Sequence, residues 1–110
     1  MPCDLDVRRI ALSLPEAYEA AHFDLTSFRV AKKIFCTMDE GAQRIMLKFD
    51  PEDQRNLVAD DPATIEPVPG YWGQKGSTYV QFGKLDEARL ATLMRLAWTH
   101  VAPKRLSRAS

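Results

Sequence analysis

The chain has 110 residues, of which 45% are apolar and 27% charged. These values are typical of one globular domain that buries a core without a disulfide or metal, and they exclude disordered and fibrous classes. Lysine plus arginine equals aspartate plus glutamate, at 15 each, which argues against a strongly basic protein that binds nucleic acid non-specifically.

The cysteines and the N-terminus bear on the compartment. Cys3 and Cys36 form no CxxC pair, so we expect free thiols in a reducing environment. The N-terminus has no apolar run of the signal-peptide kind, and no apolar stretch approaches the roughly 20 residues of a membrane span. We therefore expect a cytoplasmic protein without membrane association.

The first half of the chain predicts one helix and four strands. A helix is expected at about Leu5–Ser13, with Asp4 as its N-cap and Pro15 beyond its end. Weak alternation favours a strand over Ala17–Asp24. Clearer alternation of apolar and polar residues predicts three further strands, Ser27–Val30, Lys33–Met38 and Arg44–Phe49.

Two tight turns join these three strands. Ala31 and Lys32 form the first, although neither is the Gly or Asn that such turns favour. Asp39–Ala42 forms the second, in which Gly41 can adopt a positive φ. The period of two predicts that one face of the second strand is apolar, formed by Ile34, Cys36 and Met38.

The second half begins with an acidic helix. Asp50 as N-cap and Pro51 at the first helical position predict its start, and it should run to about Ala59. Pro62–Gly70 contains three prolines and is expected to be an extended connection. A strand over Thr78–Phe82 follows.

A long amphipathic helix completes the expected fold. It begins at Leu85 or Asp86, runs to about Val101 and is ended by Pro103, and we expect Leu106–Ser110 to fray. The order of helix, hairpin-linked strands, helix, strand and helix predicts an α+β domain, residues 1–110, with helices packed on one face of an antiparallel sheet. Residues 103–110 would form a short basic tail.

Catalytic and metal-binding patterns are absent from the sequence. His22 and His100 belong to no GxSxG, HExxH, SxxK or CxxC motif, so we expect no enzyme, no catalytic residue and no cofactor. Cys3 and Cys36 do not have the spacing of metal ligands relative to these histidines. An acidic ridge for iron stays an alternative, and it would use Asp4, Asp6, Glu16, Glu19 and Asp24.

Charge is unevenly distributed along the chain, because residues 27–48 and 71–110 are mainly basic and residues 49–70 mainly acidic. If the strands are neighbours, one sheet face gathers cations that meet phosphates and a ring that stacks on bases. These candidate nucleic-acid-binding residues are Arg29, Lys33, Arg44, Lys48, Lys75 and Tyr79. The alternative is that the cations only solvate the sheet. Trp72 and Trp98 are expected in the core, and Lys75 is expected to be exposed.

Gly70–Leu106 joins a Trp-Gly turn, a basic loop, a strand and a helix without a gap. Shorter segments support the same order, namely Leu14–Glu16, Ser27–Val30, Lys33–Phe35, Leu47–Asp50 and Trp98–Lys104. With these segments the chain resembles the MmcQ/YjbR family of small bacterial proteins. The resemblance implies a CyaY-like (frataxin-like) α/β sandwich and DNA binding by a double-wing arrangement, and it carries no catalytic residues.

The sequence therefore predicts a monomeric, non-enzymatic module that binds DNA through a basic sheet face and loop. The alternative is a module that binds a protein partner or a small ligand through the same face or through a cleft near Trp72 and Tyr79. Clustered cations away from the acidic helix favour DNA, whereas an aromatic-lined pocket favours the alternative.

Overall fold

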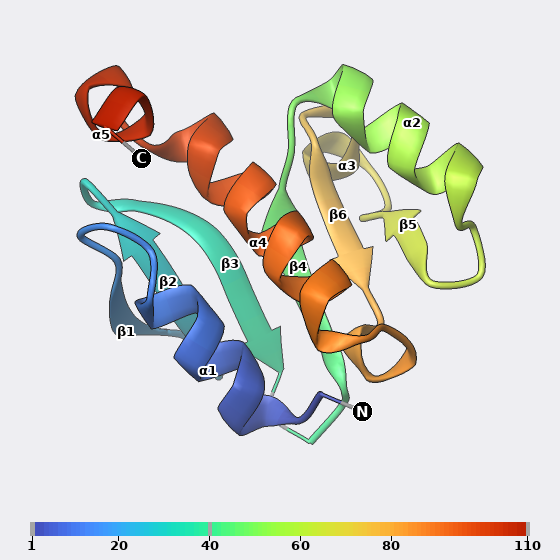
Figure 1. Ribbon diagram of the computed structural model, residues 1–110. Coiled ribbons are helices and arrows are strands. Elements are labelled where there is room, and N and C mark those ends of the chain that lie inside the picture. The colour runs from blue at the N-terminus through green and yellow to red at the C-terminus, as the bar shows by residue number, and fades with distance from the viewer. Residues whose placement is uncertain (1, 40, 110) are drawn as a thin grey trace.

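An antiparallel sheet of six strands forms the frame of the computed structural model, which describes residues 2–39 and 41–109. The strand order is β1-β2-β3-β4-β6-β5, and each neighbouring pair is antiparallel (Figure 1). The strands are β1 (Tyr18–His22), β2 (Leu25–Val30), β3 (Lys33–Asp39), β4 (Arg44–Lys48), β5 (Ile65–Pro67) and β6 (Ser77–Val80).

Helices cover one face of this sheet. The helices are α1 (Asp4–Leu12), α2 (Pro51–Asp60), α3 (Tyr71–Gln74), α4 (Glu87–Val101) and α5 (Lys104–Ala109), with a 3₁₀ turn η1 (Phe82–Lys84) before α4. Helix α4 crosses β3 and β4, and α1 lies beside it (Figure 1). The arrangement confirms the expected α+β class, with helices against one face of an antiparallel sheet. Among the described residues, no helix has the length and apolar character to cross a membrane.

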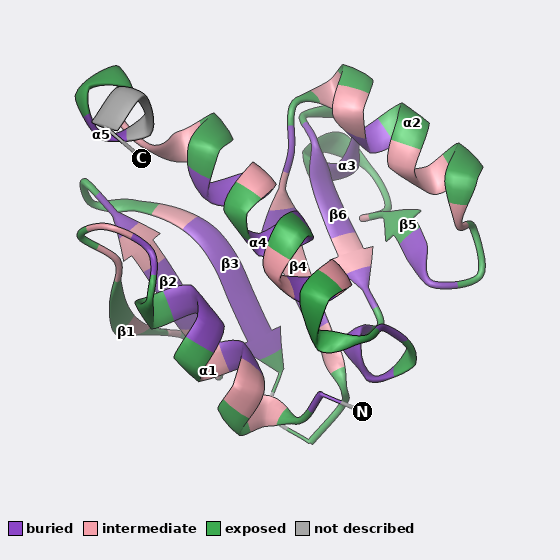
Figure 2. Ribbon diagram, viewed as in Figure 1, coloured by how far each residue is buried: buried purple, intermediate pink, exposed green. Residues whose placement is uncertain are grey.

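The core lies between the sheet and helices α1 and α4, where the buried surfaces of α4 and β3 meet (Figure 2). Its largest side chain is Trp98, which is fully buried and donates a hydrogen bond from Nε1 to the carbonyl oxygen of Pro15 at 3.1 Å. The expectation that Trp98 anchors the core is confirmed. This hydrogen bond offsets the free energy needed to remove the indole N–H from water, so the whole ring can be buried.

Both ends of the chain differ from expectation. Helix α1 begins at Asp4 with Cys3 as its N-cap, so Asp4 is not the cap. The carboxylate of Asp6 accepts the N–H of Cys3 at 2.9 Å, and this hydrogen bond holds the pKa of Asp6 below its usual value. The basic tail forms α5 instead of fraying, with Leu106 buried and Arg105 paired to Glu16 at 3.1 Å; Ser110 lies outside the described residues.

Both predicted hairpin turns occur where expected. Ala31 and Lys32 have φ values of 51° and 67°, so two non-glycine residues occupy the left-handed region that this tight turn requires. Gly41 has a φ of 86° in the second turn, whose residue Glu40 lies outside the described residues. Both turns allow β2, β3 and β4 to pair in sequence order.

The pairing of β2 with β3 contains one register shift, between Phe28 and Arg29. Phe28 pairs with Cys36 but Arg29 pairs with Ile34, so β3 has one extra residue, Phe35, at this point. Phe35 enters the core, and Ile34 is moved to the opposite face from Cys36. The prediction that Ile34 shares a face with Cys36 was wrong, because strict alternation ignores the bulge.

Two short elements were missed in the connection before β6. Strand β5 pairs with β6 at the sheet edge, within the segment expected to be an extended connection, and α3 replaces the expected loop around Trp72. A Cβ at Gly73 would clash with the carbonyl oxygen of Val68, and one at Gly76, where φ is 109°, would clash with the carbonyl oxygen of Phe49. Both glycines therefore permit backbone contact that fixes α3 against the sheet.

The side chain of Gln54 fastens α2 to this region. Its Nε2 amide donates to the carbonyl oxygens of Gly73 (2.9 Å) and Ser77 (3.0 Å) and to Oγ1 of Thr78 (3.0 Å). The Thr78 hydroxyl in turn donates to the carbonyl oxygen of Gly76 at 2.9 Å. Gln54 is buried, so water cannot replace its amide in these contacts; the carbonyl oxygens of Gly73 and Ser77 also accept the backbone N–H groups of Gly76 and Val68.

We predict that Gln54→Ala lowers the free energy of unfolding by about 2–3 kcal/mol, because it removes the buried hydrogen bonds of the Gln54 amide and opens a cavity. The matched control is Asn56→Ala, an exposed residue of the same helix, which should change stability by less than about 0.5 kcal/mol. Urea unfolding followed by circular dichroism measures both. Equal effects in the two variants would contradict the role assigned to Gln54.

The two cysteines should differ in reactivity. Burial raises the pKa of the Cys36 thiol, so little reactive thiolate forms, whereas Cys3 is exposed. We predict that a thiol reagent modifies only Cys3 in the native protein near neutral pH and modifies Cys36 only after unfolding. Mass spectrometry of the labelled protein with and without denaturant checks this, and rapid native labelling of Cys36 would refute it.

Candidate functional site

The second face of the sheet is the open face, defined by the row of paired residues Ser27, Thr37, Met46 and Tyr79. Helices α1 and α4 lie on the covered face, and Leu57 and Val58 place α2 against the core on that side as well. Within the described ranges, α3 is the helix that borders the open face, beside β6 (Figure 1). The open face is therefore the largest part of the sheet available to a partner.

A groove of about 500 Å³ runs across the open face. Met46, Thr37 and Ile34 line its centre, where the bulge of β3 has placed the Ile34 side chain. Phe23, at the turn between β1 and β2, borders one end, and Trp72 of α3 borders the other. The lining is mainly apolar, which is typical of a ligand-binding groove.

Cations pair with aromatic rings along one side of this groove. The guanidinium carbon of Arg44 lies 4.0 Å from the centroid of the Tyr79 ring. The Lys48 Nζ lies 5.6 Å from the Trp72 ring, and the Lys75 Nζ lies 5.4 Å from the Tyr71 ring. Attraction between a cation and an aromatic face holds such side chains near each other without neutralising the charge.

The structure brings together most of the candidate residues but not all. Arg44, Lys48 and Tyr79 share the open face because β4 and β6 are paired, and Lys75 follows α3 beside them, exposed as expected. Arg29 also lies on the open face, but its guanidinium donates to Oγ of Ser27 at 3.0 Å and to the carbonyl oxygen of Ala21 at 3.2 Å. Arg29 therefore fastens β2 to β1.

Lys33 does not join the site. It pairs with Val30, which is buried on the covered face, so the side chain of Lys33 starts on the side opposite Ile34. The bulge that turns Ile34 onto the open face thus turns Lys33 away from it. Of the six candidate residues, Arg29, Arg44, Lys48 and Tyr79 share the open face of the sheet. Lys75 lies beside the sheet at the end of α3, and Lys33 lies on the opposite face, so the expectation of a single shared face was wrong for Lys33.

Three aromatic residues at the groove were not identified as surface residues from the sequence. Trp72 is 60% exposed, so the expectation that it anchors the core was wrong, and its neighbour Tyr71 is 61% exposed. Phe23 is 93% exposed and has a φ of 56°, which is unfavourable for a bulky residue. Phe23 and Asp24 form the two-residue turn between β1 and β2, because His22 pairs with Leu25. Asp24 is a residue type that favours turns, and it was a sign in the sequence that Phe23 could lie at the surface.

Acidic residues limit the positive area of the open face. Glu66 pairs with Tyr79 across β5 and β6, and Asp39 pairs with Arg44 across β3 and β4, so both acids start from the open face. The acidic helix α2 packs on the covered side. The strongest positive region is therefore the end of the groove at Lys48 and Lys75.

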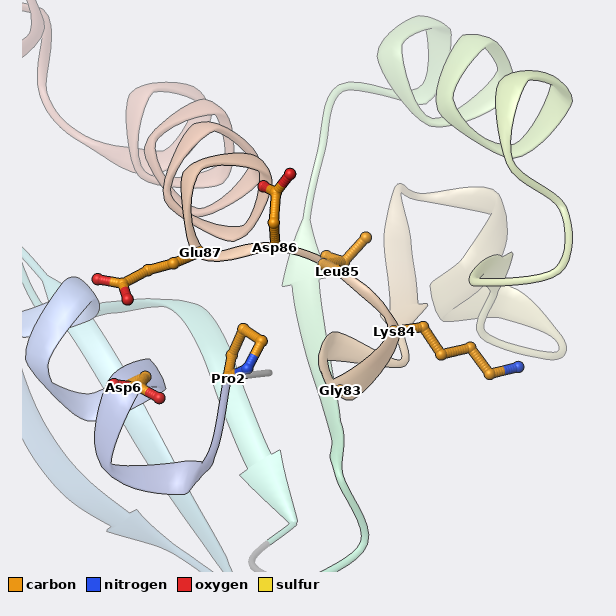
Figure 3. Close-up of a pocket in the computed structure, with 7 residues that line it drawn as sticks. All are labelled: Pro2, Asp6, Gly83, Lys84, Leu85, Asp86 and Glu87. Atoms are coloured by element: carbon orange, nitrogen blue, oxygen red, sulfur yellow. The ribbon is translucent and has the colours of Figure 1, made fainter.

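A different hollow, of about 380 Å³, lies between the starts of α1 and α4 (Figure 3). Its polar groups have structural roles. Asp6 and Glu87 both pair with Arg9, which raises the pKa of Arg9, and Asp86 caps α4 by accepting the N–H of Arg89 at 2.7 Å. Lys84 points away from the hollow (Figure 3). We assign this hollow to the packing of the two helix N-termini.

Three of the five acids considered as an iron-binding ridge are engaged in ion pairs, and a fourth, Asp4, accepts the N–H of Gly41 at 3.1 Å. Glu19 pairs with Arg8 at 2.8 Å, Glu16 with Arg105, and Asp6 with Arg9. Among the described residues, no three His, Cys, Asp or Glu side chains are grouped so that they could hold a metal ion. These acids stabilise α1, β1 and α5 at their contacts.

No curated protein matches the chain. Among solved structures, the Deinococcus radiodurans protein DR2400, with a domain described as DUF419, is similar in fold, with a TM-score of 0.80 and 22% identity over 99% of this chain and 88% of that one. The family model described as YjbR matches residues 12–100, from the end of α1 to the last turn of α4. The resemblance drawn from the sequence is thus confirmed, and this chain belongs to the YjbR family.

Proposed function

We propose that this protein is a monomeric, non-enzymatic module that binds DNA through the open face. The observation that carries the proposal is the line of three cation–aromatic pairs beside a groove on the uncovered side of the sheet. Lysine and arginine side chains neutralise phosphates and release counterions, which supplies most of the affinity for nucleic acid. Arg44, Lys48 and Lys75 take this role, with Tyr79 positioning Arg44.

The separation of charge explains how a neutral chain binds a polyanion. Five of the six acids of residues 49–70 belong to α2 or to its two caps, and α2 packs on the covered side. Lys48 lines the groove of the open face, and Lys75 lies over the ring of Tyr71 in α3, which borders that face. Interactions beyond about 10 Å are largely screened at 0.1 M salt. A phosphate at the open face therefore responds to the local cations more strongly than to the net charge.

The apolar lining of the groove favours a second candidate, the binding of a small ligand or a protein segment. Leu25, Ile34, Met46 and Val68 offer contacts to an apolar partner but no charge. A ligand of this kind would bind with little dependence on salt, whereas the contacts with phosphates weaken steeply as salt rises. The salt dependence of binding separates the two candidates.

We predict that the double variant Lys48→Gln with Lys75→Gln weakens DNA binding and lowers the log–log salt slope by about two, roughly one for each lost phosphate contact. The matched control, Arg55→Gln with Arg95→Gln, removes the same charge from exposed positions on α2 and α4 and should leave the slope unchanged. Fluorescence anisotropy with a labelled duplex and a labelled single strand, from about 50 to 200 mM salt, measures the slope.

Two outcomes would contradict this assignment. Equal losses in the two double variants would mean that net charge, and not the open face, governs binding. No binding of either DNA at low salt by the folded wild type would reject DNA binding and favour the small ligand or protein segment.

Glu66 supplies an independent prediction of opposite sign. Because its carboxylate starts beside Tyr79 on the open face, it repels phosphate there. We predict that Glu66→Gln tightens DNA binding about two- to fivefold at low salt, the range expected for one exposed charge. Glu52→Gln, an exposed acid of α2, serves as the control and should have no effect. Weaker binding by Glu66→Gln would show that the phosphates follow a different path.

A further inference from the structure

We infer that the nucleic acid bound at the open face is single-stranded, with bases stacked on Trp72 and Phe23 at the two ends of the groove. The inference rests on the proposed function and specifies its ligand. The shared chemistry of a DNA and an RNA strand, an unpaired base next to a phosphate, is what the groove recognises.

Most of the surface of the two rings gains no burial from the fold. Phe23 leaves 93% of its surface in water and adopts a φ of 56°, which costs free energy for a bulky residue. Trp72 leaves 60% of its surface in water. A soluble protein gains nothing from such exposure, so rings held at a groove are best explained by a partner that covers them.

Each ring is held in place by the backbone around it and by neighbouring side chains. Trp72 stands on α3, which Gly73, Gly76 and the Gln54 amide hold against the sheet. The ring edge of His22 lies against Phe23, with centroids 4.8 Å apart. Both rings are therefore presented in a stable orientation, which lowers the entropy lost when a base stacks on them.

The groove has the size and charge for a short length of strand. It crosses from the β1–β2 turn to α3 over β3 and β4, which corresponds to roughly 14 Å at about 4.8 Å per strand. About four nucleotides fit this length at roughly 3.4 Å for each stacked base. Lys48 and Lys75 stand at the Trp72 end, where they can reach the phosphates of the same strand.

A duplex does not fit this arrangement as well. Its bases stack on one another and present only their edges in the grooves, so an aromatic face has no base to receive. A single strand offers unstacked bases, and their π faces are alike in all four nucleotides. The groove therefore selects single strands with little preference for sequence.

The experiment compares four probes of about 16 nucleotides, the upper site size for a single-strand-binding fold of this size. They are a thymine strand, a uracil RNA strand, a duplex and an abasic strand. We expect the folded wild type to bind one or both base-containing single strands at least about tenfold more tightly than the duplex or the abasic strand. The two base-containing strands show whether DNA or RNA is preferred.

The decisive variants are Trp72→Ala and Phe23→Ala, both of exposed residues whose loss leaves the core intact. Each should weaken single-strand binding by about 5- to 150-fold, the range for one stacked base, and Trp72→Phe should recover part of it. The matched control is Leu5→Ala, which truncates an exposed apolar residue of α1 and should change binding less than about twofold.

Tryptophan emission gives a second readout. Trp72 is exposed and Trp98 is buried, so a single strand should quench the emission of the wild type but not that of Trp72→Phe. Tighter binding to the duplex, with no effect of Trp72→Ala, would overturn single-strand recognition and leave the proposed function standing. No binding to any of the probes at low salt would overturn both.

Discussion

The Gln54 amide is the contact on which the candidate site depends. It joins α2 to the carbonyl groups that end α3 and begin β6, in a buried place where water cannot substitute for it. Because α3 has one turn and could not persist alone, its position comes from this contact and from the close backbone approach at Gly73 and Gly76. Trp72 belongs to α3 and Lys75 directly follows it. The position of both therefore depends on the Gln54 side chain, which comes from α2 on the covered side of the sheet.

The second constraint is that the helices occupy a single face of the sheet. Helices α1 and α4 bury the apolar sides of β2, β3 and β4, and the core between them contains Trp98 and the phenylalanines Phe28, Phe35, Phe49 and Phe82 (Figure 2). The opposite face keeps a mixture of polar, apolar and charged residues and is bordered by α3. The same division places the acidic helix α2 on the covered side and Lys48 and Lys75 at the open face. A chain with no net charge thus has two sides of different electrostatic character.

Local conformations at the groove are unfavourable for stability. A phenylalanine with positive φ and an exposed tryptophan both cost free energy that a replacement by polar residues would recover. Such features concentrate at binding sites, because the contacts they await form only with the partner. By contrast, Arg29 forms its hydrogen bonds within the sheet, and Asp6, Glu16 and Glu19 form ion pairs within the protein. These side chains stabilise the fold and are not directed at a partner.

The sequence by itself determined the longer helices and strands and the fold class, because periods of two and 3.6 and the caps at Asp50 and Asp86 are local signals. Alternation also determined that Arg44 and Lys48 share a face of β4, whereas the pairing of β4 with β6 brought Tyr79 beside them. Tertiary structure alone decided the bulge that exchanges Ile34 and Lys33 between faces, the short elements β5 and α3, and the different fates of Trp72 and Trp98. Whether an aromatic ring is buried depends on which distant segments of the chain pack against it, and a local sequence pattern does not specify those segments.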